Sequence, residues 1–183
     1  AATVGKTLIT VQEAYIYRSL QRLRDNKTPY IQIEVGPELK KTVQRLAFEE
    51  MVFQEMRSIE YLDTQKNADD KRARALRDKN RAGWNEIQKR FAVSDSDLLR
   101  AAAKSLQVES FLQKKVETLT PMITDAEVEA YYNQQRERFK GEDISKHKTS
   151  IVALLRKQAS QKGLEDWVRS LKEKYGVVSR LGG

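Results

Sequence analysis

The chain's one histidine lies close in sequence to an aspartate and a serine, the residue types of a hydrolytic triad. Asp143 and His147 are four residues apart, so they share one face if the segment is helical, and Ser150 follows. Acyl transfer by such a set also needs a shaped pocket and oxyanion-hole donors, and nothing in the surrounding sequence indicates either. We therefore interpret His147 as a solvated surface residue and expect no catalytic activity.

A second group of acidic residues resembles the start of a calcium-binding loop. Asp95 and Asp97 have the spacing of its first two ligands, but Leu99 and Ala101 fall at later ligand positions. The sixth position also lacks the glycine that such loops need. The chain contains no cysteine, which excludes thiolate metal sites and disulfides. We expect no metal, and the absence of a glycine-rich phosphate loop predicts no nucleotide or other cofactor.

The composition predicts a helical protein with one substantial core. The chain has 183 residues, of which 39% are apolar and 33% charged, with only 8 Gly and 3 Pro. No apolar run approaches the roughly 20 residues of a membrane-spanning helix. The first residues, Ala1-Ala2, are compatible with cleavage of a signal peptide or with a boundary of another origin.

The net charge of +8 bears on partners and not on the fold. Residues 66–91 contain nine basic and four acidic side chains, which gives this segment a net charge of +5. Such charge attracts nucleic acid, acidic lipid headgroups or acidic polypeptides, and it also occurs on helices whose charged faces are simply solvated. Charge alone does not choose among these.

Capping signals predict where two helices begin. Thr124 with Glu127, and Thr10 with Glu13, each form the pattern of a capping box. The first pair predicts a helix of about four turns over residues 123–139, before Gly141. The second predicts a helix from Thr10 to about Arg24.

The remaining elements follow from hydrophobic periodicity, glycine and proline. Residues 1–9 suit a short strand with a possible turn at Gly5-Lys6, and residues 30–35 suit an extended segment. Long apolar stripes predict helices over residues 38–62, 95–118 and 144–175, with residues 177–181 as a last strand. The wide apolar arc of residues 38–62 indicates the central core helix. In the basic segment, a solvated first part precedes a docking part that carries Trp84, Ile87 and Phe91, with Gly83 as the expected divider.

The order of three helical segments resembles the N-terminal domain of SurA-like periplasmic chaperones. These segments read WNEIQKRF, SDSDLLRAAAKSLQVESFLQKKV and ITDAEVEAYYNQQRERF. The match is carried by Leu99-Arg100-Ala101, by Thr124 to Val128, by Tyr131-Tyr132 and by Phe139, and it spans most of residues 1–140. In that family a parvulin-type prolyl isomerase domain follows, but here only residues 140–143 precede the next helix.

The resemblance implies a mainly α fold of the SurA N-terminal-domain type, in a single domain over residues 1–183. Residues 1–139 would form its N-terminal helical part. Residues 144–183 would supply a long C-terminal helix that packs back on this part and a strand that pairs with residues 2–9. The parvulin domain would be missing, with its flanking pieces joined.

The implied function is an ATP-independent periplasmic holdase for unfolded or outer-membrane client proteins. Prolyl isomerase activity is not expected, because parvulin sites use paired histidines with a Cys or Asp neighbour, and this chain has one His and no Cys. Client binding would use adaptable apolar and aromatic side chains. The candidates are Met51, Phe53, Met56, Tyr61, Tyr131 and Tyr132. Met51 and Met56 also suit plain core packing.

Two further interpretations concern partners. A homodimer with swapped C-terminal helices would supply missing elements from a second copy. The alternative function is a basic helical nucleic-acid-binding protein that uses the faces of residues 66–90 and 146–180. No recognised motif supports that alternative, so the chaperone interpretation predicts no nucleic-acid partner. The identity of the clients and the oligomeric state do not follow from the sequence.

Overall fold

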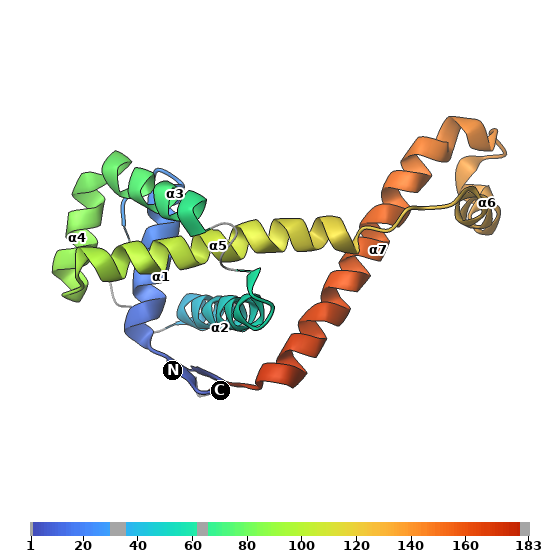
Figure 1. The fold of residues 1–183 in the computed structure, drawn as a ribbon. Coiled ribbons are helices and arrows are strands. Elements are labelled where there is room, and N and C mark those ends of the chain that lie inside the picture. The colour runs from blue at the N-terminus through green and yellow to red at the C-terminus, as the bar shows by residue number, and fades with distance from the viewer. Residues whose placement is uncertain (1, 30–35, 62–65, 180–183) are drawn as a thin grey trace. The chain divides into compact units, whose positions relative to one another are not determined.

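The computed structural model describes residues 2–29, 36–61 and 66–179, and within them the protein is mainly helical (Figure 1). Contacts divide the chain into two compact units. Unit 1 comprises Ala1–Phe111 and Leu171–Gly183, and unit 2 comprises Leu112–Ser170. The boundaries between the units, after Phe111 and after Ser170, fall inside two long helices. The single domain over residues 1–183 stays a prediction.

Unit 1 is built mainly from five helices. Their bounds are α1 (Val11–Arg24), α2 (Pro37–Ser58), α3 (Lys66–Lys79), α4 (Arg81–Phe91) and the first part of α5 (Asp95–Leu119). The predicted capping box of α1 is present, because Thr10 Oγ1 accepts from Glu13 N at 3.1 Å and Glu13 Oε2 accepts from Thr10 N at 2.7 Å. Pro37 begins α2 as predicted, but α2 ends at Ser58, before the expected residue 62. The expected extended segment 30–35 lies outside the described residues.

The core of unit 1 lies where α1, α2, α4 and α5 meet. Trp84 is fully buried and its Nε1 donates to Asp95 Oδ1 at 3.0 Å, which ties α4 to the start of α5. Phe91 stacks on Tyr15 of α1 with ring centroids 6.4 Å apart. Burial of one such large apolar side chain contributes about 1.5–3 kcal/mol. The docking face predicted for the second part of the basic segment is therefore present.

The division between α3 and α4 lies at Asn80, and Gly83 lies inside α4. The prediction that Gly83 separates the two was wrong, because this glycine permits a close approach of helices. A Cβ atom at Gly83 would lie 2.7 Å from Leu23 Cδ2 and 3.2 Å from Pro29 Cδ. Glycine is therefore placed here by packing against the end of α1.

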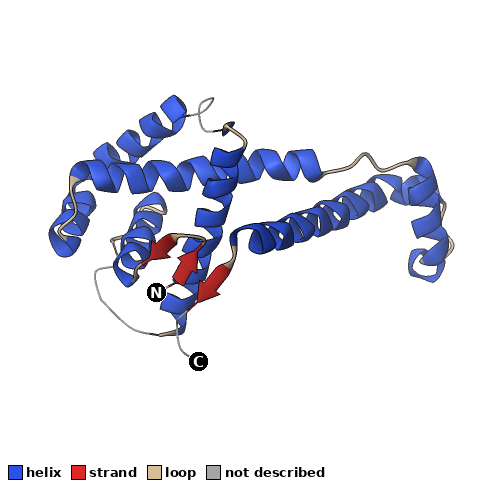
Figure 2. Ribbon diagram, turned by 60° about the horizontal axis from the view of Figure 1, so that its bottom comes forward, coloured by secondary structure: helices blue, strands red, loops and turns tan. Residues whose placement is uncertain are grey.

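Three short strands form an antiparallel sheet in the order β2-β1-β3 (Figure 2). They are β1 (Ala2–Val4), β2 (Thr7–Ile9) and β3 (Val177–Ser179). Gly5-Lys6 forms the turn of the β1–β2 hairpin, with Gly5 at φ +55°. On the other edge of β1, Val4 pairs with Val177 and Ala2 with Ser179. The predicted pairing of the N-terminal and C-terminal strands is confirmed over these residues; residues 180 and 181 lie outside the described part.

Unit 2 contains the end of α5, then α6 (Asp125–Gln134), the short 3-10 helix η2 (Arg136–Phe139) and most of α7 (Ile144–Tyr175). The second capping box is present, with Glu127 N donating to Thr124 Oγ1 at 3.3 Å. The predicted helix over residues 123–139 is interrupted at Gln135, and α7 has the predicted bounds. No helix in the described ranges has the length and apolar character needed to cross a bilayer.

Two glycine substitutions should have opposite effects on stability. In Gly83→Ala, overpacking of about 1–3 kcal/mol should outweigh a gain of about 1 kcal/mol in helix propensity, so the free energy of unfolding should fall by about 1 kcal/mol. In Gly163→Ala of α7, the new Cβ would meet Leu119 Cβ at 3.5 Å, an ordinary contact, so the same propensity gain should stabilise unit 2.

Urea unfolding followed by tryptophan fluorescence measures both effects, because Trp84 lies in unit 1 and Trp167 in unit 2. Stabilisation by both alanines would contradict the close-packing explanation for Gly83.

Candidate functional site

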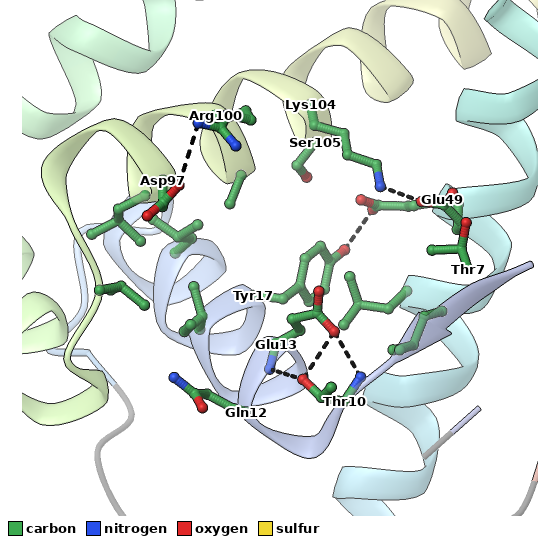
Figure 3. Close-up of a pocket in the computed structure, with 18 of the residues that line it drawn as sticks. Thr7, Thr10, Gln12, Glu13, Tyr17, Glu49, Asp97, Arg100, Lys104 and Ser105 are labelled. Carbon is green, nitrogen blue, oxygen red and sulfur yellow. Dashed lines mark hydrogen bonds and ion pairs between the residues drawn. The ribbon is translucent and has the colours of Figure 1, made fainter. Parts of the chain in front are cut away.

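A cavity of about 480 Å³ lies in unit 1 between β2, α1, α2 and α5 (Figure 3). This volume is within the range of about 300–1,000 Å³ that ligand pockets usually have. Most of its wall is apolar. The apolar lining residues are Leu8, Ile9, Ile16, Leu20, Leu46, Val93, Leu98 and Ala101.

One end of the cavity is formed by a buried carboxylate network. Tyr17 OH of α1 donates to Glu49 Oε1 of α2 at 2.6 Å, and Arg45 Nε lies 3.6 Å from the same oxygen. The Glu49 side chain is only 8% exposed, and this burial raises the pKa of its carboxyl group. Burial, together with the neighbouring charge of Glu49, also raises the pKa of Tyr17. The hydroxyl therefore keeps its proton and acts as a hydrogen-bond donor at neutral pH.

The adjacent carboxylate, Glu50, has different neighbours. It forms an ion pair with Lys104 of α5 and accepts a hydrogen bond from Gln54 Nε2 at 2.9 Å. Burial acts to raise the pKa of Glu50, but the hydrogen bonds from Lys104 and Gln54 outweigh it and the pKa is lowered. Lys104 Nζ also lies 4.9 Å from the ring centroid of Phe53.

The charged groups of the cavity are thus mostly neutralised in pairs. At its other side, Arg100 and Asp97 of α5 form an exposed ion pair of 3.3 Å, and Glu13 is held by the capping box. Figure 3 shows these polar groups, with carbon-only side chains of the lining beside them. Within the described residues, no group of three or more His, Cys, Asp or Glu side chains is placed to hold a metal ion. The arrangement suits apolar side chains of a ligand, with polar groups that orient it.

The residues of the possible hydrolytic triad are not brought together. His147 Nε2 lies 3.2 Å from Glu142 Oε2, and Ser150 donates to the backbone oxygen of His147. Asp143 accepts from Ser145 N at 2.8 Å and acts as a helix cap. Of the two residues that resembled a calcium loop, Asp95 accepts from Trp84 and Arg77, and Asp97 accepts from Ser94.

None of the six residues suggested for client binding lines the cavity. Met51 and Met56 are 2% and 1% exposed, so they pack in the core and are closed to a client in this arrangement. Phe53 is half-buried beside Lys104, and Tyr61 packs edge-on against Phe111 at 4.8 Å.

Tyr131 and Tyr132 are half-buried in unit 2, and both contact the ring of Phe139. The same ring lies 4.8 Å from that of His147. These two tyrosines therefore belong to an aromatic cluster that holds η2 against α6 and α7, and they lie in a different unit from the cavity.

Comparisons of the chain with protein-family models, curated proteins and solved structures found no match. The resemblance to SurA-like chaperones therefore rests on the motifs in the sequence and stays a prediction.

Sequence reasoning missed the cavity because its walls come from segments far apart in the chain, at residues 7–20, 46–50 and 93–105. One signal was available. Glu49 and Glu50 interrupt the most apolar stretch of α2, and a charged pair on a helix buried on several sides requires partners.

The contributions of the two neighbouring glutamates, Glu49 and Glu50, to the free energy of unfolding should change with pH in opposite directions. The raised pKa of Glu49 gives stability that is complete below its ordinary value of 4.5 and is lost as pH rises through the raised value. Glu49→Gln cannot ionise, so its free energy of unfolding relative to wild type should increase from acid to neutral pH.

Glu50 is the matched control for this measurement. Its lowered pKa gives stability that is present above 4.5 and is lost as pH falls through the lowered value. Glu50→Gln should therefore be less stable than wild type at neutral pH, and the deficit should shrink on acidification. Urea unfolding of wild type and both variants from acid to neutral pH measures these differences. If the difference from wild type changed with pH in the same direction for both variants, the opposite pKa shifts of Glu49 and Glu50 would be refuted.

Proposed function

We propose that the protein is an ATP-independent chaperone of the cell envelope that binds apolar segments of unfolded client proteins in the cavity of unit 1. The observation that carries the proposal is the open, mainly apolar wall formed by β2, α1, α2 and α5. The resemblance of the helical motifs to SurA-like periplasmic chaperones supplies the compartment and the class of client. Prolyl isomerase activity is not part of the proposed function.

The chemistry of the wall suits many weakly bound clients. Each apolar client side chain that leaves water gains about 25 cal/mol per Å² of buried surface, without a requirement for one sequence. The ion pairs Lys104–Glu50 and Arg100–Asp97 leave no large excess of one charge in the cavity. Binding of this kind needs no nucleotide and tolerates varied sequences, as a holdase requires.

The alternative, a nucleic-acid-binding protein, would use the basic segment of α3 and α4. That surface is partly neutralised within the protein. Arg72 pairs with Asp69 at 3.1 Å, and Arg77 lies 2.9 Å from both Asp78 and Asp95. In these contacts part of the positive charge of α3 and α4 is used in ion pairs within the protein. We therefore retain the chaperone as the proposed function.

A charge placed in the cavity should abolish client protection. Leu46 of α2 lines the cavity and is half-buried, so Leu46→Glu should introduce a charge into the apolar wall and slow aggregation of an unfolded outer-membrane protein far less than wild type does. Ile59 is 54% exposed and does not line the cavity. Ile59→Glu is therefore the matched control and should protect the client like wild type. Circular dichroism and urea unfolding establish that both variants are folded.

A salt titration separates the two functions. Affinity for a random DNA duplex should be weak if the proposal holds, whereas a nucleic-acid-binding protein would show tight binding that falls steeply and log-linearly with salt. Client binding by the apolar wall should change much less over the same range. Tight, salt-sensitive DNA binding without protection of the client would replace the chaperone with the alternative.

A further inference from the structure

Among the residues that the structure describes, the outer edge of β2 carries no further strand, and this edge lies beside the cavity. The strand order β2-β1-β3 places β1 in the middle, so within the described residues β2 has a strand neighbour on one side only. All three residues of β2 line the cavity, and Leu8 is 56% exposed. An edge strand presents backbone N–H and C=O groups that can pair with another extended chain.

The hydrogen bonds of β1 show which backbone groups of β2 are available. The two-residue turn Gly5-Lys6 joins β1 to β2, and the residues that flank such a turn, Val4 and Thr7, form a hydrogen-bonded pair. In the turn itself, Gly5 N donates to Gly176 O at 3.2 Å. Successive residues of a strand point their N–H and C=O groups to opposite sides, so Val4 and Ala2 face β2. Their partners in β2 are Thr7 and Ile9.

Leu8 stands opposite Thr3, between these two pairs. In an antiparallel ladder such a residue forms no hydrogen bonds with its partner, and its N–H and C=O groups point away from β1. These two groups therefore face the open edge. On the C-terminal side the edge stops at Thr10, because the Thr10 N–H is bound by Glu13 Oε2 at 2.7 Å.

We propose that an extended segment of the client pairs with β2 through the backbone of Leu8 and inserts alternate apolar side chains into the cavity. The inference rests on the proposed function and narrows its client class to segments that alternate apolar and polar residues. The open N–H and C=O of Leu8 select an extended ligand, since a helix satisfies its own backbone groups and would leave both without a partner. Alternation follows because successive side chains of a strand point to opposite faces.

Leu8→Pro tests the pairing without removing a bond of the existing sheet. Proline lacks the N–H, and the Leu8 N–H is the one that points away from β1. The probe is a fluorescent peptide of about eight residues with alternating leucine and threonine, which matches the usual length of a strand. Leu8→Pro should weaken its binding about tenfold, the effect of losing one backbone hydrogen bond and its register. Leu8→Val keeps the N–H and isolates the contribution of the side chain, so loss of one methylene group should weaken binding by at most about fourfold, less than Leu8→Pro does.

Methylation of the peptide backbone gives an independent readout. N-methyl groups on all peptide residues whose N–H faces β2 should weaken binding about tenfold, as Leu8→Pro does, because they remove the hydrogen bond to the Leu8 C=O and leave the apolar contacts in place. Methyl groups on the intervening residues should be tolerated, because successive N–H groups of a strand point to opposite sides. On addition of the unmodified peptide, hydrogen exchange of the Leu8 amide should slow.

Several results would overturn the inference. Equal loss in Leu8→Pro and Leu8→Val would mean that only the side chain matters. Methylation effects without a period of two would exclude strand pairing, and concentration-dependent dimers with a protected Leu8 amide would show that a second copy occupies the edge. In each case, protection of the client by wild type but not by Leu46→Glu would leave the proposed function standing. If wild type and Leu46→Glu protected the client equally, or neither did, the proposed chaperone function of the cavity would itself be refuted.

Discussion

The pairing of β1 on both of its edges is the constraint on which the arrangement of unit 1 depends. On one edge it holds β3, which brings the end of α7 back to the N-terminus, where Tyr175 OH and Lys174 Nζ each donate to Glu55 Oε2 of α2 at 2.7 Å. On the other edge it holds β2 beside the cavity. The whole of unit 2 therefore lies, in sequence, between two parts of unit 1. Closure of so long a segment costs little more than closure of a short one, because the entropy grows only with the logarithm of length.

The walls of the cavity are joined by the two adjacent carboxylates of α2. Successive residues of a helix point in different directions, so Glu49 reaches Tyr17 of α1 and Glu50 reaches Lys104 of α5. A buried carboxylate that lost its partner would be costly, so each pair fixes the distance between α2 and one neighbour. The cations beside the two carboxylates, Arg45 at 3.6 Å from Glu49 and Lys104 paired with Glu50, compensate their charges, which favours an apolar ligand. The two adjacent glutamates of α2 therefore contribute both to the position of the cavity walls and to the chemistry of the cavity.

Local signals in the sequence predicted local structure well. Thr10 and Thr124 mark the starts of α1 and α6, Pro37 marks the start of α2, and Gly176 ends α7 at φ +60°. Tertiary packing was harder to predict. In the sequence, Gly83 suggests a break between two helices. Only the structure, with Leu23 close against it, shows that this glycine allows α4 to pack closely on α1. The cavity could not be predicted from the sequence. Periodicity places a residue such as Leu46 on the apolar face of its helix, but it does not show whether other side chains fill the space beside that residue.

The short length of the β2 edge determines how the binding energy would be divided between backbone pairing and apolar contacts. Proteins usually protect edge strands with charge, proline or short length, because a long exposed edge promotes aggregation. Here the strand has three residues, and of these only Leu8 directs its backbone outward. One residue offers at most two hydrogen bonds, each with a net value of about 1 kcal/mol, which is too little to recruit a partner alone. The apolar wall would therefore supply most of the affinity, and the edge would fix the direction and register of the chain. A short edge beside a large apolar wall also limits self-association of the protein, since two copies could share the edge but could not both fill the cavity.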